Sequence, residues 1–343
     1  MISKNPDILL IYTGGTIGMV KEHGTGILKP FSFDNILKKI PELQQLTCNV
    51  ASVSFDNPID SSDVSIAHWI EIVTIIEHHY KNYSGFVILH GSDTMSYTAS
   101  ALSFLLKNLS KPVILTGSQL PIGHLRTDAK ENLITAIQIA ALEENGVAIV
   151  KEVGLYFEYK LYRGNRTTKI SAAYFNAFHS FNYPELVQSG VELDVLRENL
   201  WKNEGNIAFF ARKIMDNNVA ILKLFPGMNL SVLDNLITIT GLKVLILETY
   251  GSGNAPADTK FLKILDSARQ KGILIINVTQ CAGGSVKMGE YNSSSELKKL
   301  QVINGKDITI ESALCKAMYL LGLKLSADAF RTQFETSICG EIS

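Results

Sequence analysis

The sequence predicts an α/β protein with two domains, a larger N-terminal domain built on a parallel sheet and a smaller C-terminal α/β domain. Short apolar runs alternate with longer segments whose apolar residues recur at helical spacing, a pattern typical of parallel sheets covered by helices. The chain has 343 residues, enough for two domains, and the alternation weakens once, near residues 183–206.

In the first half of the chain, strands and helices are expected to alternate. Strands are predicted at residues 8–12, 48–55, 86–90, 113–116 and 153–159. Helices are predicted at residues 65–80, 97–107 and 127–144. In the first of these helices, Trp69, Val73 and Ile76 follow helical spacing, and Ser65 is a suitable N-cap.

The second half resumes the alternation after a weaker region. Pro184, Gly190 and the polar stretch 197–206 are typical of a crossover linker. We therefore expect an N-terminal domain over 1–190, a linker over 191–215 and a C-terminal domain over 216–343. In the C-terminal domain, strands are predicted at 219–225, 243–248 and 273–278, and helices at 231–236, 258–270 and 310–323. Ser231 and Asp234 predict a weak capping box at the first of these helices.

Composition excludes several classes of function. Lys and Arg number 32 against 33 Asp and Glu, so there is no basic field for nucleic acid, and a small, weakly charged substrate fits better. No stretch approaches the roughly 18 apolar residues of a membrane span, and the short run 8–12 is no signal segment. We expect a soluble cytoplasmic protein. The four cysteines form no C-x-x-C pair and the histidines no H-E-x-x-H, so no metal or cofactor is expected.

Residues 13–18, TGGTIG, follow the first predicted strand and place Thr16 after two glycines. Glycine allows a sharp turn and the close approach of a ligand. A plain strand-to-loop turn is one alternative. A phosphate loop is another, but the segment matches neither G-x-x-x-x-G-K-[ST] nor G-x-G-x-x-G, which disfavours nucleotide binding.

Residues 90–95, HGSDTM, have the same layout after another predicted strand. Asp93 and Thr94 stand next to each other just before a helix, whose first N–H groups can bind a carboxylate or an oxyanion. A simple N-cap is the alternative. Open α/β sheets place their chemistry at the carboxyl ends of strands. Two hydroxyls there, one beside a carboxylate, favour an amidohydrolase with a threonine nucleophile.

TGGTIG and HGSDTM resemble the two signature motifs of the bacterial-type L-asparaginase family. Further similar segments cover nearly the whole chain: DSSD at 60–63, TGSQ at 116–119, LRTD at 125–128, LYRGNRTTK at 161–169, YGSGNAP at 250–256 and TQC at 279–281. The RGNRTTK and YGSGNAP segments resemble the cytoplasmic type I branch. The resemblance implies the two-domain asparaginase/glutaminase-like fold.

The resemblance also implies a reaction, the hydrolysis of L-asparagine to L-aspartate and ammonia without a cofactor. The Thr16 hydroxyl would attack the side-chain amide and form a β-aspartyl ester. Asp93 would hold Lys169, Lys169 would polarise Thr94, and Thr94 would position or deprotonate the nucleophile or the water. A desolvated lysine can serve as a base, but the Asp93 charge opposes its deprotonation, so the group that takes the proton stays open.

The family's substrate contacts map onto this chain as a set of polar and glycine residues: Gly15, Asp60, Ser61, Ser62, Asp93, Thr94, Ser118 and Asn254. Asn254 would reach the site of a neighbouring subunit, so a homo-oligomer, a dimer or tetramer, is implied. From the residues alone, Ser61–Asp63 could equally begin a helix, and Lys169 could be an ordinary solvated lysine.

Two departures from the family pattern affect rate and regulation. Many members have a tyrosine on the loop after the first threonine, but this chain has none between Tyr12 and Tyr80. We expect the loop 21–29, with Gly24 and Gly26, to form a mobile lid, in which Thr25 supplies the missing hydroxyl. An unchanged kcat in Thr25→Ala would refute this.

The second departure lies in a possible effector site that some cytoplasmic relatives have, here represented by Thr168, Glu248 and Cys281. Those relatives have an arginine where Glu248 stands, and an acidic side chain repels the carboxylate that an arginine would bind. The sequence therefore predicts weak or absent activation by asparagine.

Other functions remain open from the sequence. A glutaminase-asparaginase is the nearest, because one methylene is worth only about 1–3 kcal/mol in a pocket. An amidotransferase subunit that feeds ammonia to tRNA-bound glutamate would need a tRNA-docking domain. A non-catalytic asparagine sensor would bind the amino acid without releasing ammonia.

Overall fold

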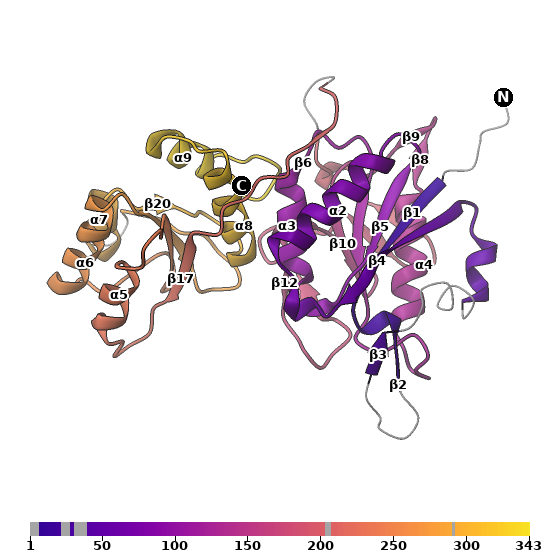
Figure 1. The fold of residues 1–343 in the computed structure, drawn as a ribbon, viewed down its shortest axis with the longest axis horizontal. Coiled ribbons are helices and arrows are strands. Elements are labelled where there is room, and N and C mark those ends of the chain that lie inside the picture. The colour runs from indigo at the N-terminus through magenta and orange to yellow at the C-terminus, as the bar shows by residue number, and fades with distance from the viewer. Residues whose placement is uncertain (1–6, 22–27, 31–39, 203–206, 290–291) are drawn as a thin grey trace. The chain divides into compact units, whose positions relative to one another are not determined.

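The computed structural model describes residues 7–21, 28–30, 40–202, 207–289 and 292–343. The chain divides into two compact domains, Met1–Lys213 and Ile214–Ser343, and each is described by itself. The first carries the indigo and magenta segments of Figure 1 and the second the orange and yellow ones. Both domains are helices packed on sheets, so the predicted two-domain α/β class is confirmed.

The first domain is built on an eight-stranded sheet in the order β15-β14-β11-β10-β7-β5-β1-β4. Its strands are β1 (Asp7–Gly14), β4 (Asn49–Ile59), β5 (Gly85–Leu89), β7 (Val113–Thr116), β10 (Val153–Phe157), β11 (Lys160–Arg163), β14 (Val187–Ser189) and β15 (Leu193–Val195). The run from β4 to β10 is parallel, as the alternation predicts.

The other end of this sheet is antiparallel, so the predicted parallel sheet carries an antiparallel edge and is mixed. A turn of only two residues, Glu158 and Tyr159, joins β10 to β11. Both residues have positive φ, 45° and 67°, the geometry of a tight hairpin turn. The strand predicted over 153–159 includes this turn, because Glu-Tyr is not a usual turn sequence.

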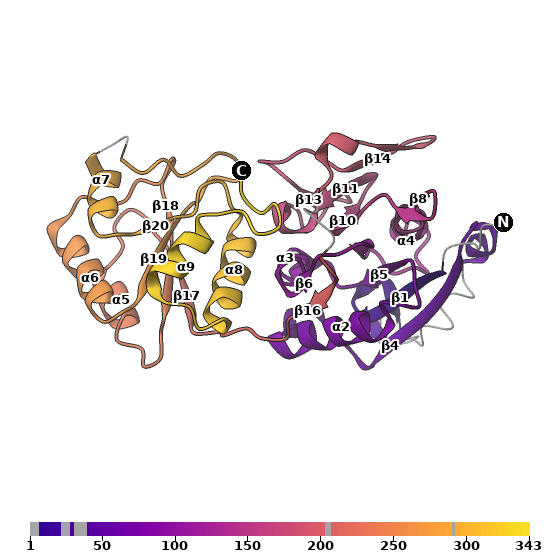
Figure 2. The same cartoon turned by 90° about the horizontal axis from the view of Figure 1, so that it is seen from above.

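Helices cover both faces of the sheet. They are α2 (Ile66–His79), α3 (Met95–Leu105) and α4 (Ala129–Ala140). Leu133 and Ala136 of α4 pack in one apolar cluster with Ile8 and Leu10 of β1. Figures 1 and 2 show α2 and α3 on the opposite face. Ser65 is the N-cap of α2, as predicted.

Two predicted helices extend too far at their C-terminal ends. The helix expected over 97–107 ends at Leu105, and β6 (Leu106–Lys107) then pairs with β16 (Phe210–Ala211). The helix expected over 127–144 ends at Ala140, and residues 143–148 form the hairpin of β8 (Glu143–Glu144) and β9 (Val147–Ala148). Asn145 and Gly146 form the turn of this hairpin with φ of 54° and 76°, and the Asn-Gly pair is its signal in the sequence.

The segment 191–215, expected to be a linker, begins inside the first domain. Its residues 193–195 form β15, which pairs with β14, and Phe210–Ala211 forms β16. Short two- and three-residue pairings complete this domain: β2 (Met19–Lys21) with β3 (Leu28–Pro30), and β12 (Thr168–Lys169) with β13 (Phe178–His179).

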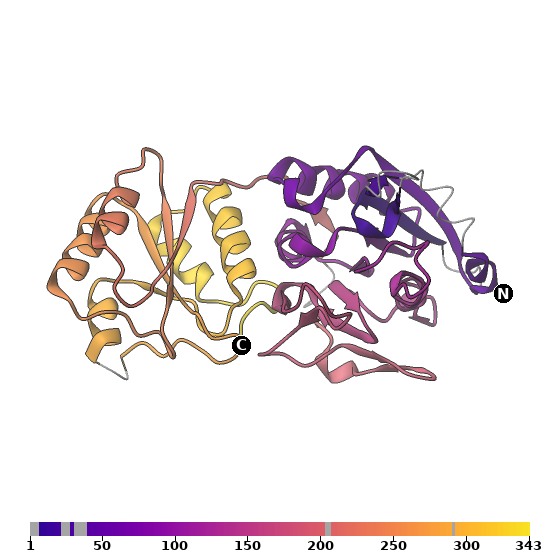
Figure 3. The same ribbon diagram turned by 90° about the horizontal axis from the view of Figure 1, so that it is seen from below.

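The second domain has a parallel sheet in the order β17-β18-β19-β20. Figure 3 shows the orange helices on one side of this sheet and the yellow helices on the other. Its strands are β17 (Val219–Lys223), β18 (Val244–Thr249), β19 (Leu274–Thr279) and β20 (Ile303–Asn304). Its helices are α5 (Leu230–Leu236), α6 (Thr259–Gln270), α7 (Asn292–Lys299), α8 (Ile310–Gly322) and α9 (Ala327–Phe334). The predicted capping box at α5 is wrong, because Asn229 is the N-cap and accepts from the Ser231 N–H. Among the described residues, no helix combines the length and the apolar character that a membrane span requires.

Candidate active site

Three loops meet where the parallel strands β1, β4 and β5 end. The Gly15 N–H donates to the Ile59 carbonyl at the end of β4 (3.2 Å). A Cβ built on Gly15 would lie 2.5 Å from the Gly91 nitrogen, and one built on Gly91 would lie 2.5 Å from the Ser61 Oγ. Both contacts are too close for any side chain, so glycine at 15 and 91 is what lets the three loops touch.

Thr16 lies directly at this junction. It begins the 3-10 turn Thr16–Gly18, which the Gly18 N–H closes onto the Gly15 carbonyl (3.2 Å), and its side chain is half-buried. Tyr12 lies under the turn, since a Cβ built on Gly18 would lie 2.0 Å from its hydroxyl oxygen. Burial raises the pKa of Tyr12 to about 12, so this phenol stays protonated at neutral pH.

Lys169 reaches the second motif from β12. Its Nζ lies 2.6 Å from the Asp93 Oδ1 and 2.9 Å from the Ser92 Oγ. The lysine side chain is 17% exposed and the aspartate side chain 69% exposed, so the carboxylate faces solvent while the ammonium is enclosed. The structure thus brings together Lys169 and Asp93, two residues that are 76 positions apart in the chain.

The hydroxyl that contacts Lys169 belongs to Ser92, which is not among the predicted site residues. The expected partner was Thr94, but its Oγ1 donates to the Ser61 carbonyl instead (2.7 Å). Residues Ser92–Thr94 form a 3-10 turn. With three residues per turn, successive side chains point in three different directions. The hydroxyls at 92 and 94, one on each side of Asp93, look equivalent in the sequence, and only the backbone conformation distinguishes them.

The loop after β4 supplies a second carboxylate. The Asp60 Oδ1 accepts from the N–H and from the hydroxyl of Ser62, each at 2.9 Å. These hydrogen bonds lower the pKa of Asp60, so it is ionised at neutral pH. Asp60 caps the 3-10 turn Ser61–Asp63, which agrees with the alternative that these residues begin a helical turn. Ser61 is buried in the junction, whereas Ser62 is exposed.

His90 stabilises the start of the Ser92–Thr94 turn through contacts of both its ring nitrogens. Its Nδ1 lies 2.7 Å from the Gly91 carbonyl, and its Nε2 lies 2.9 Å from the Thr98 hydroxyl. Trp69 donates to the same hydroxyl (3.0 Å). Complete burial lowers the pKa of His90 to about 4. A neutral ring needs its proton on Nδ1 to face a carbonyl, so Nε2 accepts from Thr98.

The segment that carries Lys169 is anchored by a buried ion pair. The Arg163 Nε lies 2.6 Å from the Glu152 Oε2, with both side chains almost fully buried. The same guanidinium lies 4.2 Å from the ring centre of Tyr183. Thr167 donates to the Arg163 carbonyl (2.8 Å) and closes the short turn before β12. The lysine therefore extends from a fixed backbone.

The remaining predicted residues belong to other segments of the chain. Ser118 is buried and its hydroxyl donates to the Leu120 carbonyl (2.6 Å). In the second domain, the Asn254 N–H donates to the Tyr250 carbonyl (2.8 Å) in a tight turn. Glu248 lies on β18 and Cys281 is exposed after β19, while Thr168 belongs to the first domain. Gly24, Thr25 and Gly26 fall outside the described residues, so the lid stays a prediction.

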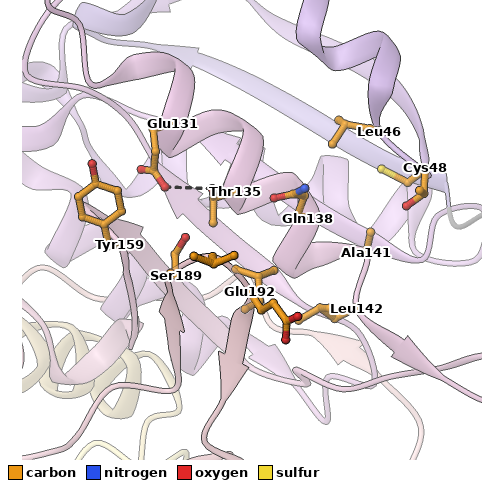
Figure 4. Close-up of a pocket in the computed structure, with 14 residues that line it drawn as sticks. Leu46, Cys48, Glu131, Thr135, Gln138, Ala141, Leu142, Tyr159, Ser189 and Glu192 are labelled. Atoms are coloured by element: carbon orange, nitrogen blue, oxygen red, sulfur yellow. Dashed lines mark hydrogen bonds between the residues drawn. The ribbon is translucent and has the colours of Figure 1, made fainter.

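A separate cavity of about 790 Å³ lies in the first domain between α4 and the β14–β15 hairpin (Figure 4). Glu131, Thr135 and Tyr159 are among its lining residues, and none of the predicted site residues lines it. In the part of the chain that the structure describes, no three His, Cys, Asp or Glu side chains are grouped as a metal site requires.

Comparison with known proteins agrees with this architecture. The family model for the asparaginase N-terminal domain matches residues 7–201, and that for the glutaminase/asparaginase C-terminal domain matches residues 218–334. L-asparaginase 1 of Escherichia coli strain K12 is 39% identical over 337 residues, 98% of each chain. A 60 kDa lysophospholipase of Mus musculus is 38% identical, over 92% of this chain and 58% of that protein.

Solved structures show the same relationship. The crystal structure of L-asparaginase I from Vibrio cholerae matches with a TM-score of 0.90 and 36% identity, over 99% of this chain and 100% of that one. The fold and these similarities define an amidohydrolase. Since both family models match in sequence order and cover most of its length, the chain belongs to the asparaginase family.

Proposed function

We propose that the protein hydrolyses L-asparagine to L-aspartate and ammonia. The observation that carries this proposal is the contact of Gly15, Gly91 and Ser61, which gathers a threonine, a lysine-bound serine and two carboxylates at the ends of three parallel strands. The kinship with L-asparaginases supports asparagine as the amide.

In the proposed reaction, the Thr16 hydroxyl attacks the side-chain amide carbonyl of asparagine. A new C–O bond forms, the C–N bond breaks, and the amide nitrogen leaves as ammonia with the proton that the hydroxyl released. Water then adds to the β-aspartyl ester, which releases aspartate and restores the hydroxyl. A threonine hydroxyl is a weak nucleophile and needs a neighbouring base. Ser92, held by Lys169, takes the role that the sequence analysis gave to Thr94.

Substrate recognition follows from the charges around the junction. Asp60 and Asp93 are carboxylates that would pair with the α-ammonium group of asparagine. Ser61, Gly15 and the Thr94 hydroxyl bond keep the loops at a fixed separation. Ser62, Ser118 and Asn254 remain proposed contacts, carried by the resemblance alone.

Three further properties stay predictions. The protein would form a dimer or tetramer in which Asn254 reaches a neighbour, and would act in the cytoplasm. It would also accept glutamine to some extent, because a pocket separates substrates that differ by one methylene by only about 1–3 kcal/mol.

Ammonia release by purified wild type and Thr16→Ala, with L-asparagine and L-glutamine as substrates, tests the proposal. We expect the wild type to release ammonia from asparagine. Thr16→Ala should do so at least about 10³-fold more slowly, because the nucleophile is removed. Asparagine binding without ammonia release would indicate a sensor instead, and equal rates on both amides a glutaminase-asparaginase.

A further inference from the structure

We propose that Gln119 is a positioning residue that directs the Ser92 hydroxyl and, through it, holds Lys169. The inference deepens the proposed function and rests on the roles given there to Ser92 and Lys169. Gln119 lies in the loop between β7 and α4, and its side chain joins two segments that meet at the site.

The orientation of the Gln119 amide follows from its neighbours. Its Nε2 lies 3.0 Å from the Tyr174 carbonyl and 3.5 Å from the Ser171 carbonyl. Carbonyl oxygens only accept, so the NH₂ group must face them. The Oε1 then faces the other way, 3.1 Å from the Ser92 Oγ. The amide is therefore oriented by the hydrogen bonds on both of its ends.

This orientation dictates how Ser92 uses its single proton. An amide oxygen only accepts, so the Ser92 hydroxyl must donate to Gln119. The lone pairs of Ser92 are then left for the Lys169 Nζ at 2.9 Å. Lys169 in turn donates to two acceptors, Ser92 and Asp93. Without Gln119, the serine hydroxyl could turn among its three staggered rotamers.

The backbone of Gln119 is held as firmly as its side chain. The Gln119 N–H donates to the Asp128 Oδ2 (2.9 Å), and the Leu120 N–H to the Asp128 Oδ1 (3.1 Å). Asn132, one turn along α4, donates to the Gly117 carbonyl (3.0 Å). Helix α4 thus fixes the loop from which Gln119 extends, which is the support that a precisely placed catalytic group requires.

The first test is a double-mutant cycle on the rate of ammonia release. Gln119→Met keeps the length of the side chain but removes its three hydrogen bonds, to Ser92, Tyr174 and Ser171. We expect kcat to fall about 10- to 100-fold, because a displacement of about 1 Å near the chemistry costs up to about 10²-fold, and KM to stay within about twofold. Gln138→Met, at an exposed glutamine of α4, is the matched control and should keep the wild-type kcat.

The Ser92→Ala background separates positioning from a general structural role. If Gln119 acts through Ser92, adding Gln119→Met to Ser92→Ala should change kcat by less than about twofold, because coupled residues are not additive. The inference would be overturned if Gln119→Met lowered kcat by the same factor in the Ser92→Ala protein as in the wild type. A wild-type kcat in Gln119→Met alone would also overturn it.

A second measurement does not depend on activity. The Nζ protons of an ammonium group held by two acceptors exchange slowly with water, and lysine-¹⁵N NMR can detect them. The signal assigned with Lys169→Met should broaden or disappear in Gln119→Met and persist in Gln138→Met. An unchanged signal would overturn the inference. If the wild type releases no ammonia from asparagine, the proposed function fails, and the NMR result alone decides the role of Gln119.

Discussion

At the scale of single residues, three adjacent side chains have different tasks. Ser92 accepts from Lys169, Asp93 pairs with the same ammonium, and Thr94 donates to the Ser61 carbonyl of the neighbouring loop. The motif HGSDTM predicted that chemistry lies here, but sequence spacing could not assign the two hydroxyls, because a 3-10 turn sends consecutive side chains in different directions.

Comparison of Ser92→Ala with Thr94→Ala tests this assignment. Ser92→Ala should lower kcat at least about 10²-fold, since it removes the hydroxyl next to Lys169. Ser92→Thr should keep most of the activity, because it restores the hydroxyl. Thr94→Ala should mainly lower stability, by about 1 kcal/mol, through the lost hydrogen bond. Steady-state kinetics and denaturant unfolding measure both, and a larger kcat loss in Thr94→Ala would reverse the assignment.

The buried His90 makes stability depend on pH. Its folded pKa of about 4 lies below the ordinary 6.5, so the unfolded chain binds more protons between these values. The stabilisation is complete above pH 6.5 and is lost as the pH falls toward 4. From pH 7 to pH 5 this residue should cost about 2 kcal/mol of unfolding free energy. Urea titrations of wild type and His90→Gln check this, and an equal pH slope in the two proteins would contradict it.

At the scale of elements, the periodicity of apolar residues predicted the parallel core of the first sheet and its three helices. It could not predict the antiparallel edge, where strands β14 and β15 have three residues each and are too short for a pattern. The helices α3 and α4 end earlier than predicted because strand pairing competes with helix propensity. After α3 the pairing is with a distant strand, and after α4 it is a local hairpin.

Two glycines allow the effect of a positive φ to be distinguished from the effect of a close contact. Gly15 and Gly146 both have positive φ, 88° and 76°. A Cβ on Gly146 would meet nothing within 4 Å, whereas one on Gly15 would meet the Gly91 backbone at 2.5 Å. Gly146→Ala should therefore cost about 1–2 kcal/mol of stability and leave kcat unchanged.

Gly15→Ala should cost more stability than Gly146→Ala and also lower kcat by about 10²-fold, because the loops of Thr16 and Ser92 must move apart. Thermal unfolding and ammonia release give both values. A Gly15→Ala protein with a wild-type kcat would show that the contact of the loops is not needed for the reaction.

At the scale of the whole molecule, the sequence predicted two α/β domains, and each has its own sheet and helices. The residues of the possible effector site are divided between them, with Thr168 in the first domain and Glu248 and Cys281 in the second. Sequence motifs identify such residues singly. Their spacing in an assembled protein depends on how the domains and subunits are arranged.

We expect weak or absent activation by asparagine, because Glu248 places a carboxylate where the family resemblance implies an arginine that would bind one. The rate should follow a hyperbola from low to saturating asparagine. Glu248→Arg, which restores the positive charge, is the variant in which a sigmoidal dependence of the rate on asparagine should appear. A sigmoidal curve in the wild type would contradict the prediction.

The most direct test of the account is to trap the covalent intermediate. Wild-type protein mixed with L-asparagine and quenched in acid during turnover should carry an aspartyl group on the peptide that contains Thr16, detected by mass spectrometry after digestion. Thr16→Ala, treated identically, should carry none and should release no ammonia above background. An aspartyl group on a different residue, or a Thr16→Ala protein that turns over at the wild-type rate, would contradict the assignment of Thr16 as the nucleophile.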